Sequence, residues 1–323
     1  MKTIVVTGGA GFIGSNFIKK NIGRYKIINI DKLTYASNIK FLNSIPKSKN
    51  YKFFKIDINN TKKIISIIKN QKPVYLFNFA AESHVDNSIK NSDDFIDANI
   101  LGTHSLLKSV LRNKKFLDSN FKFIQISTDE VFGDVKKNYH TKESDRYNPS
   151  SPYSSSKAAA DHLVSSWGRT YNINYNITYS SNNFGPNQNN EKFIPVILHS
   201  ILNNKKIPVY GDGMQRRDWI YVEDNIDGIL KVATHGKINH TYNVGSSYSL
   251  TNLALIKRIC FVLISKFNFN KNIYNLIEFV KDRPGHDRNY SLDSAKLNNL
   301  HWKCNFDFNS AIVQTIRWYL ANK

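Results

Sequence analysis

The sequence predicts an α/β protein with a Rossmann-type, doubly wound parallel sheet and a smaller C-terminal domain. Over roughly the first 180 residues, short runs rich in β-branched and aromatic residues alternate with longer segments of helical periodicity. Parallel strands need crossover connections, and a helix between successive strands supplies them. A glycine-rich segment links the first predicted strand to the first predicted helix, where such a sheet turns most tightly.

The elements follow from this alternation in chain order. The expected strands are 3–7, 26–30, 51–56, 74–79, 121–126 and 174–179, and the expected helices are 12–22, 61–69, 93–111 and 153–170. After about residue 180 the pattern breaks into loops rich in Asn, Gly and Pro, interleaved with shorter elements. We therefore expect a first domain over residues 1–180, with returning segments near 221–245, and a second domain mainly over residues 181–323.

Composition excludes several classes of protein. The 323 residues are 41% hydrophobic and 22% charged, and no apolar run is long enough for a membrane span. The two cysteines, Cys260 and Cys304, are too few for a disulfide framework or a cysteine-rich metal site. They fit a reducing compartment, so we expect a cytoplasmic protein with no bound metal. Met1 and Lys2 lead directly into the first strand, so no removable leader is expected.

The formal net charge is +20, from 45 basic and 25 acidic residues, and such an excess is typical of nucleic-acid binding. The basic residues are scattered, however, and no run reaches the length of a binding tail. Lysine and asparagine are both over-represented, which indicates biased composition. The pattern favours a solvated surface over a polynucleotide site.

The segment 7–14 reads TGGAGFIG and lies between the first strand and the first helix. Gly8, Gly11 and Gly14 let the chain turn tightly and let backbone approach a pyrophosphate at the helix N-terminus, where free N–H groups favour anions. Asp31, at the end of the second strand, is placed to accept both ribose hydroxyls and to repel a 2′-phosphate. The pattern predicts dinucleotide binding, with NAD favoured over NADP.

Three nearby residues leave alternatives open. Lys32 and Thr34, beside Asp31, keep NADP open as the cofactor. Asp57 follows the third strand, where it would meet the adenine, but it is equally interpreted as an N-cap of the helix that begins near Thr61.

Tyr153 and Lys157 are four residues apart in a predicted helix. This spacing puts both on one face, so that the ammonium lies near the phenol, lowers its pKa and contacts a nicotinamide ribose. The same spacing occurs at two other places in the chain, so it is not decisive alone. What distinguishes Tyr153 is the helix start at 150–152, with proline near the first helical position.

Thr128, Asp129 and Glu130 follow the strand 121–126, at the sheet edge where ligands bind in this architecture. Thr128 is suited to hold a substrate hydroxyl, and the two carboxyl groups offer a general acid and a general base. Burial and mutual repulsion raise the pKa of at least one of them. A solvated loop is the alternative for the doublet alone, but the glycine loop and the Tyr153/Lys157 pair favour a catalytic interpretation.

Eight motifs between residue 7 and about residue 293 follow one another as TGGAGFIGS, DKLTYASN, AAESHVDNSI, STDEVFGD, SPYSSSKAAADH, SNNFGPNQNNEKFIP, VYGDGMQRRDWIYVED and DRPGHD. Together they resemble the extended short-chain dehydrogenase/reductase superfamily and, within it, the dTDP-glucose 4,6-dehydratases. The Asp-Glu doublet after Thr128 distinguishes these dehydratases from the sugar-nucleotide epimerases.

The resemblance implies conversion of dTDP-glucose to dTDP-4-keto-6-deoxyglucose and water, with NAD+ reduced and reoxidised in each cycle. Tyr153 would take the proton of the 4-hydroxyl while Thr128 holds that hydroxyl and Lys157 stabilises the phenolate. Glu130 would then remove the C5 proton, and Asp129 would protonate the departing 6-hydroxyl. Because the cofactor ends as it began, it must be held tightly.

The resemblance also assigns the binding residues. Those implied for NAD are Gly8, Gly11, Phe12, Ile13, Gly14, Asp31, Lys32, Leu33, Thr34, Asp57, Ile58, Ala80, Ala81, Ser83, Tyr153, Lys157 and Asn183. Those implied for the sugar nucleotide are His84, Thr128, Asn182, Lys192, Phe193, Pro208, Tyr210, Arg217, Asn252, Asp282, Arg283 and His286. The first domain would thus bind NAD and the second the sugar nucleotide, with the forked guanidinium of Arg217 on the diphosphate.

Relatives pair through the helices that correspond to 93–111 and 153–170, so a homodimer is expected. The alternatives are a UDP-glucose 4,6-dehydratase or another NAD-dependent sugar-nucleotide epimerase or oxidoreductase. The choice between dTDP and UDP stays open, because the two differ mainly in a methyl group and a deoxyribose.

Overall fold

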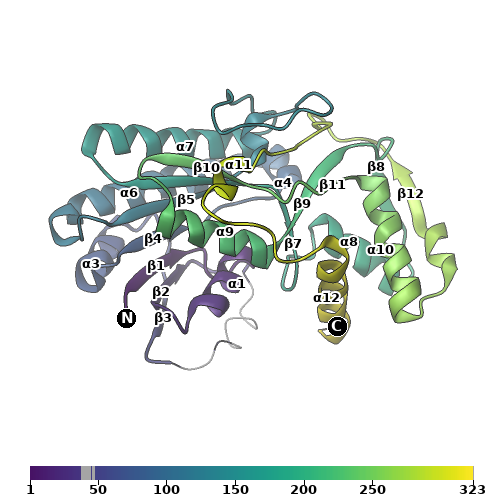
Figure 1. Cartoon of the computed structure of the whole chain (residues 1–323), viewed down its shortest axis with the longest axis horizontal. Coiled ribbons are helices and arrows are strands. Elements are labelled where there is room, and N and C mark those ends of the chain that lie inside the picture. Colours follow the sequence, from purple (N-terminus) through teal and green to yellow (C-terminus); the bar gives the residue numbers. More distant parts are fainter. Residues whose placement is uncertain (38–44, 46–47, 323) are drawn as a thin grey trace.

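The protein is described from a computed structural model that covers residues 1–37, 45 and 48–322 (Figure 1). Asn38, the last residue of the DKLTYASN motif, lies outside the described residues. The N-terminus begins the large sheet, and the last helix lies in the second lobe, at the lower right of Figure 1.

A seven-stranded, fully parallel sheet forms the larger part of the molecule. From edge to edge its strands are β10 (His240–Val244), β6 (Tyr175–Ser180), β5 (Lys122–Thr128), β4 (Tyr75–Asn78), β1 (Thr3–Thr7), β2 (Lys26–Asp31) and β3 (Tyr51–Lys55). The strand order reverses between β1 and β4, which opens a crevice at the carboxyl ends of these two strands. The predicted fold class is confirmed, and β1 has the predicted bounds.

Helices cover both faces of this sheet. On one face lie α3 (Thr61–Gln71), α6 (Gly102–Asn113) and α7 (Pro152–Tyr171), and on the other α1 (Phe12–Asn21) and α9 (Val222–His235). Side chains of β1 alternate between the two cores: Val5 packs in the cluster under α3 and α6, whereas Ile4 and Val6 pack in the cluster that holds Phe17 of α1. Because both faces are covered, almost every residue of β1, β2, β4, β5 and β6 is buried, as expected for the inner strands of a parallel sheet.

The helix predicted over 93–111 is not one regular helix. It divides into α5 (Asp93–Phe95), the π-helical segment η1 (Ile96–Leu101) and α6. Asn99 in η1 is buried, and its side chain both donates to and accepts from the backbone of Glu82. Gly102 follows, where a Cβ would lie 2.4 Å from Ile58. The wider π turn thus serves close contacts with neighbouring segments, which hydrophobic periodicity does not register.

The remaining elements are short helices around the crevice and the parts of a second lobe. They are α4 (Val85–Lys90), η2 (Lys114–Phe116), η3 (Asp129–Phe132), β7 (Asn182–Phe184), α8 (Phe193–Leu202), β8 (Ile207–Tyr210), β9 (Arg216–Tyr221), β11 (Ser249–Thr251), α10 (Asn252–Phe267), η4 (Lys271–Leu276), β12 (Ile277–Val280), α11 (Ala295–Asn298) and α12 (Phe308–Ala321). Strands β11, β9 and β7 form one small sheet, and β12 pairs with β8 in another.

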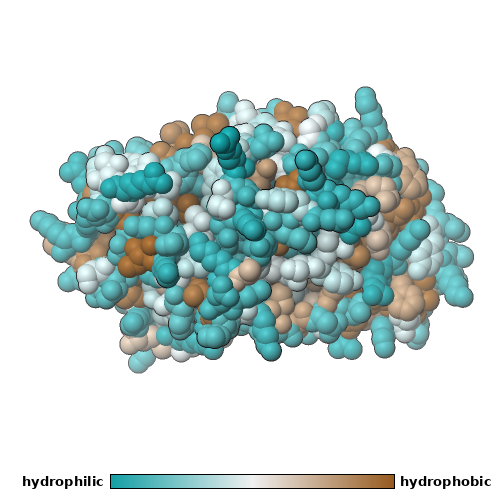
Figure 2. Space-filling view, turned by 45° about the horizontal axis from the view of Figure 1, so that its top comes forward, coloured by the Kyte–Doolittle hydropathy of each residue, from teal (hydrophilic) through white to brown (hydrophobic). Residues whose placement is uncertain are grey.

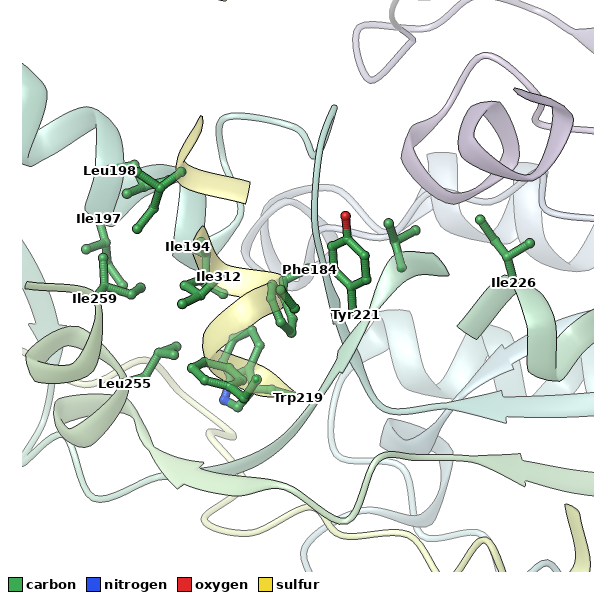
Figure 3. Close-up of a cluster of buried hydrophobic side chains, with 14 of the residues drawn as sticks. Phe184, Ile194, Ile197, Leu198, Trp219, Tyr221, Ile226, Leu255, Ile259 and Ile312 are labelled. Atoms are coloured by element: carbon green, nitrogen blue, oxygen red, sulfur yellow. The ribbon is translucent and has the colours of Figure 1, made fainter. Parts of the chain in front are cut away.

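The second lobe packs α8, α10 and α12 around β9 (Figure 3). Trp219 and Tyr221 of β9 lie with Phe184, Ile194 and Ile312 among the buried side chains. The same cluster continues without a break into the core under α1 and α9. The division at residue 180 stays a prediction, because the chain crosses between the two parts more than once.

The surface is mostly hydrophilic in the view of Figure 2, with small hydrophobic patches between polar side chains. Among the helices of the described residues, none combines the length and apolar character that crossing a membrane requires.

Candidate functional site

The glycine loop lies in the crevice and fits a dinucleotide. Gly8 has φ +68°, and a Cβ there would lie 2.5 Å from the Ala80 amide nitrogen. A Cβ on Gly14 would lie 2.4 Å from the Gly8 carbonyl oxygen. At Gly11, by contrast, φ is −77° and a Cβ would approach only that oxygen, at 3.4 Å. Neither the backbone conformation nor the packing requires glycine at position 11, so the space above Gly11 suits a bound group.

The N-terminus of α1 carries the features of an anion site. Helix α1 has no side-chain cap and no acidic residue in its first turn, so its first amides are free to bind phosphate. Gly11, Phe12, Ile13 and Gly14 all line the cleft. These residues would hold the pyrophosphate of NAD.

Two variants separate the ligand role of this loop from its folding role. Gly11→Ala is expected to fold as the wild type and to weaken NAD binding by about tenfold or more, a change of about 1.4 kcal/mol, because the methyl group enters the cofactor's space. Gly14→Ala, whose methyl group meets backbone, is expected to lower the melting temperature. Calorimetric NAD titration and thermal unfolding measure the two effects. Equal NAD affinity of Gly11→Ala and wild type would contradict the assignment.

Asp31 ends β2 beside the glycine loop. Its Oδ2 accepts from the Ala10 amide at 2.9 Å, and its Oδ1 accepts from the Leu33 amide at 2.8 Å and from Ser37 at 3.2 Å. These bonds aim the carboxylate into the pocket, and lone pairs remain for ribose hydroxyls. Lys32 lies 3.5 Å from Asp57 across the same pocket.

This adenosine half of the crevice gathers most of the cofactor residues that the sequence implied. Its lining includes Gly8, Gly11, Asp31, Lys32, Thr34, Asp57, Ile58, Ala80, Ala81 and Ala98. Leu33 supports Asp31 through its amide and has φ +62°. The interpretation of Asp57 as an N-cap is wrong, because Asn60 caps α3 by accepting from the Lys63 amide.

The second half of the crevice holds Tyr153 and Lys157, one turn apart on α7. Ser151 and Ser154 form a capping box at the start of this helix, with Pro152 in its first turn, so both side chains point from a rigid element. The Lys157 ammonium donates to the Ile126 carbonyl at 2.6 Å. Burial lowers the pKa of Lys157 and raises that of the Tyr153 phenol, which a hydrogen bond with Thr128 lowers in turn.

Thr128, Asp129 and Glu130 lie in the same cleft, where β5 passes into η3. Burial raises the pKa of Asp129 well above its usual range, and the neighbouring Glu130 charge raises it further. Its Oδ2 is buried and accepts no hydrogen bond from the described residues. Burial thus favours the protonated form of Asp129, which suits the role of an acid.

Glu130 differs from Asp129 because cations surround it. Burial raises its pKa, but Arg283, Arg217 and Lys192 lower it. These three residues come from separate segments of the chain: Lys192 precedes α8, Arg217 lies on β9 and Arg283 follows β12. Glu130 is thus the member of the doublet that is better able to be ionised and to act as a base.

Each cation is held by the protein itself. Arg217 is buried, donates to the Arg216 and Asp287 carbonyls at 2.8 Å, and lies 4.2 Å above the Tyr290 ring. The Arg283 Nη1 donates to Asp86 at 3.1 Å, while its buried Nε has no partner among the described residues.

Lys192 closes the cleft from the loop that leads into α8. Its ammonium donates to the Ser83 carbonyl at 2.6 Å. On the neighbouring residues, a His84 ring nitrogen lies 3.4 Å from the Glu191 carbonyl oxygen. Asn182 and Asn183 also line the cleft, and the side-chain amide oxygen of each is buried without a partner among the described residues. Such unpaired polar atoms are expected where a polar ligand binds.

Other residues implied for the sugar nucleotide spread away from this centre. The His286 Nδ1 atom forms a hydrogen bond of 2.6 Å with the Asp282 carboxylate, and the His286 ring lies edge-on to Tyr210. Phe193 stacks against Trp219. Pro208 pairs with Glu278 between β8 and β12, and Asn252 begins α10. Neither Pro208 nor Asn252 lines the cleft formed by the described residues.

Sequence reasoning missed several polar residues of the site. Asp86 binds both Arg283 and Tyr210. Asp161, completely buried on α7, accepts from Ser127 at 2.5 Å. Asp161 follows Lys157 by one more helical turn, so a third residue at the Tyr153/Lys157 spacing was the signal that could have found it.

The parallel sheet, the glycine loop and the Tyr153/Lys157 pair define the extended class of short-chain dehydrogenases/reductases. Within that class, the chain belongs to the GDP-mannose 4,6 dehydratase family, whose model matches residues 5–315.

Named relatives cover the whole chain. It is 44% identical over 334 residues to a dTDP-glucose 4,6-dehydratase of Haemophilus influenzae, covering 100% of this chain and 99% of the relative. A crystal structure of the Streptomyces venezuelae enzyme of the same name, with NAD bound, superposes with a TM-score of 0.91 at 33% identity and covers 99% and 97% of the two chains. The Bacillus anthracis enzyme in complex with NAD gives 0.88 at 37% identity, covering 100% and 98%.

Proposed function

We propose that the protein is an NAD-dependent hydro-lyase that converts dTDP-glucose to dTDP-4-keto-6-deoxyglucose and water. The observation that carries this proposal is that Asp129, Glu130 and Tyr153 line one cleft, where burial favours the protonated form of Asp129 and nearby cations favour the ionised form of Glu130. Relatives named dTDP-glucose 4,6-dehydratase support the nucleotide. An epimerase has no step that needs this acid and base, so the doublet favours the dehydratase over that alternative.

The first step is oxidation at C4 of the glucose. Tyr153 would accept the proton of the 4-hydroxyl, with Thr128 holding that oxygen and Lys157 stabilising the phenolate. NAD, when bound, would supply the oxidising power at C4 by holding the hydride that leaves this carbon, and the same hydride would reduce C6 later in the cycle. Burial raises the pKa of Tyr153, so the phenolate needs a cationic neighbour, and Lys157 is the ammonium one turn away.

The second step removes water across C5 and C6. The 4-ketone acidifies the C5 proton, which Glu130 would accept while Asp129 donates its proton to the 6-hydroxyl as it leaves as water. Each proton transfer of this kind contributes about 10²–10⁴-fold to the rate. Return of the hydride to C6 and of a proton to C5 would then complete the 4-keto-6-deoxy sugar.

The purified protein is therefore expected to convert dTDP-glucose with no net production of NADH and with one solvent hydrogen at C5. Mass spectrometry of the product in deuterated water measures both the loss of water and the incorporation. A mixture of dTDP-glucose and UDP-glucose in the same vessel tests the nucleotide. Preferential dehydration of UDP-glucose would show that UDP-glucose, and not dTDP-glucose, is the substrate. A product that keeps its 6-hydroxyl would overturn the proposed function.

We also propose that the protein is a cytoplasmic homodimer. Ile96 and Leu101 of η1 are 44% and 50% exposed, and a groove on the two helices is lined by His104 and Leu111 of α6 and Trp167 of α7. Apolar side chains exposed along paired helices favour association of two copies. Cys260 and Cys304 are both unpaired, as in a reducing compartment. Light scattering would report twice the 37.1 kDa chain mass.

A further inference from the structure

Asp161 is a buried carboxylate that the proposed reaction does not use. It lies on α7, four residues after Lys157 and eight after Tyr153, and its residue is 1% exposed. A carboxylate is rarely buried to this degree without a partner, because loss of hydration costs several kcal/mol. Its position on the same helix as Tyr153 and Lys157 therefore needs a physical explanation.

Hydrogen bonding accounts for only one of its two oxygens. Oδ2 accepts from Ser127 at 2.5 Å and lies 3.5 Å from the Tyr147 hydroxyl. Oδ1 is buried and accepts no hydrogen bond from the described residues. An amide would serve Ser127 equally well, so the negative charge is the property that a hydrogen-bonding role leaves unexplained.

The charge has a counterpart in Lys157. The ammonium is buried, and it donates to the carbonyl of Ile126, the residue directly before Ser127. Lys157 and Asp161 thus hold adjacent residues at the carboxyl end of β5, which leads straight into Thr128. A neutral carbonyl does not balance a buried positive charge, whereas a carboxylate one helical turn away does.

We propose that Asp161 is a positioning residue that keeps Lys157 protonated and holds the end of β5 against α7. The inference rests on the proposed function for the role of Lys157 and extends it by one residue. The direction of the pKa shifts agrees. Burial lowers the pKa of Lys157 and the Asp161 charge raises it. The pKa of Asp161 is raised to about 7, because the effect of burial exceeds the lowering by Lys157.

Other ionisable groups on the elements packed against α7 are accounted for. Asp129 and Glu130 on η3 face the substrate cleft, and Tyr179 on β6 shares a 2.5 Å hydrogen bond with Tyr147, whose ring lies beside His162. The remaining acidic groups and His104 are bound elsewhere or face away: Asp86 with Arg283, Asp94 with Asn91, Asp97 with Asn59, His104 against Trp167, and Asp93 exposed. Of the basic groups, Lys122 donates to the carbonyls of Ala233 and Gly236, and Lys90, Lys108 and Arg112 are exposed. The Tyr175 ring lies against Gly168, near the other end of α7.

The test is Asp161→Asn, which keeps an acceptor for Ser127 and removes the charge. Lys157 should then lose its proton at lower pH, so the alkaline limb of the kcat profile should move to lower pH by about one unit or more. The Asp161 charge also raises the pKa of Tyr153, so the acidic limb should move in the same direction. Ser127→Ala, which keeps the charge and loses the hydrogen bond, should leave the alkaline limb where it is.

A spectroscopic readout separates this inference from the proposed function. The Lys157 ¹³Cε resonance of lysine-labelled protein, assigned with Lys157→Arg, reports its titration without any substrate. A lower titration midpoint in Asp161→Asn, with a melting temperature near that of the wild type, supports the inference. An unchanged midpoint, or an equal shift in Ser127→Ala, overturns it. Failure of the wild type to dehydrate dTDP-glucose would instead overturn the proposed function and leave the titration result intact.

Discussion

Glu130→Gln is expected to oxidise C4 of dTDP-glucose and then to stop before water is lost. The amide keeps the shape of the side chain but does not accept the C5 proton, so dehydration should fall by about 10²–10⁴-fold. A 4-ketoglucose nucleotide that keeps its 6-hydroxyl should accumulate on the enzyme. Rapid quench followed by mass spectrometry detects it, and the absorbance of reduced nicotinamide follows it in time.

Glu278→Gln is a matched control, because Glu278 is exposed on β12 in the second lobe. It should dehydrate at the wild-type rate. The role of Glu130 as base fails if Glu130→Gln forms the 4-keto-6-deoxy product at the normal rate. The cations around Glu130 lose a charged partner in this variant, so a small change in KM is expected beside the large loss in kcat.

Tyr153→Phe is expected to block the reaction one step earlier. Phe fills the same buried space next to Phe95, whose ring lies 6.2 Å away and edge-on, so the fold should persist. Without the phenol nothing accepts the 4-hydroxyl proton, and turnover should fall by about 10²–10⁴-fold with no reduced nicotinamide. The contrast with Glu130→Gln, which reduces the cofactor but does not dehydrate, orders the two steps.

Tyr274→Phe on η4 removes a hydroxyl in the second lobe and serves as the control. It should leave turnover unchanged. Reduction of nicotinamide by Tyr153→Phe at the wild-type rate would assign the first proton transfer to another group. Thr128 would then be the next candidate, because it shares a hydrogen bond with the phenol.

The first half of the fold was predictable because its signals are local. Strand β1 has alternate residues in two separate cores, Gly8 has a positive φ, and a Cβ on Gly14 would meet the carbonyl of the nearby Gly8. The capping box at the start of α7 is likewise a short-range pattern. Periodicity, turn chemistry and capping act over a few residues, so the sequence displays them directly.

The site was predictable only in part, because its chemistry depends on distant segments. Sequence reasoning gave Asp129 and Glu130 as an acid and base pair without deciding between their environments. That difference comes from Arg217, Arg283 and Lys192, whose charges act on Glu130 from separate segments of the chain. No spacing in the sequence encodes this convergence, and the resemblance to known dehydratases identified these residues instead. Both the π-helical segment and Asp161 escaped notice because tertiary contacts explain them.

The large sheet can be completed only after strand β10 has been synthesised. This strand lies at the edge of the large sheet against β6, yet some sixty residues, which include β9 and α8 of the second lobe, separate the two in sequence. Lys122 of β5 also donates to the carbonyls of Ala233 and Gly236, which end α9. A nascent chain released at residue 180 would therefore carry an unpaired strand edge and an unbound buried ammonium. The nucleotide-binding half is thus completed by sequence that is translated after it, and a truncated first half should aggregate rather than bind NAD.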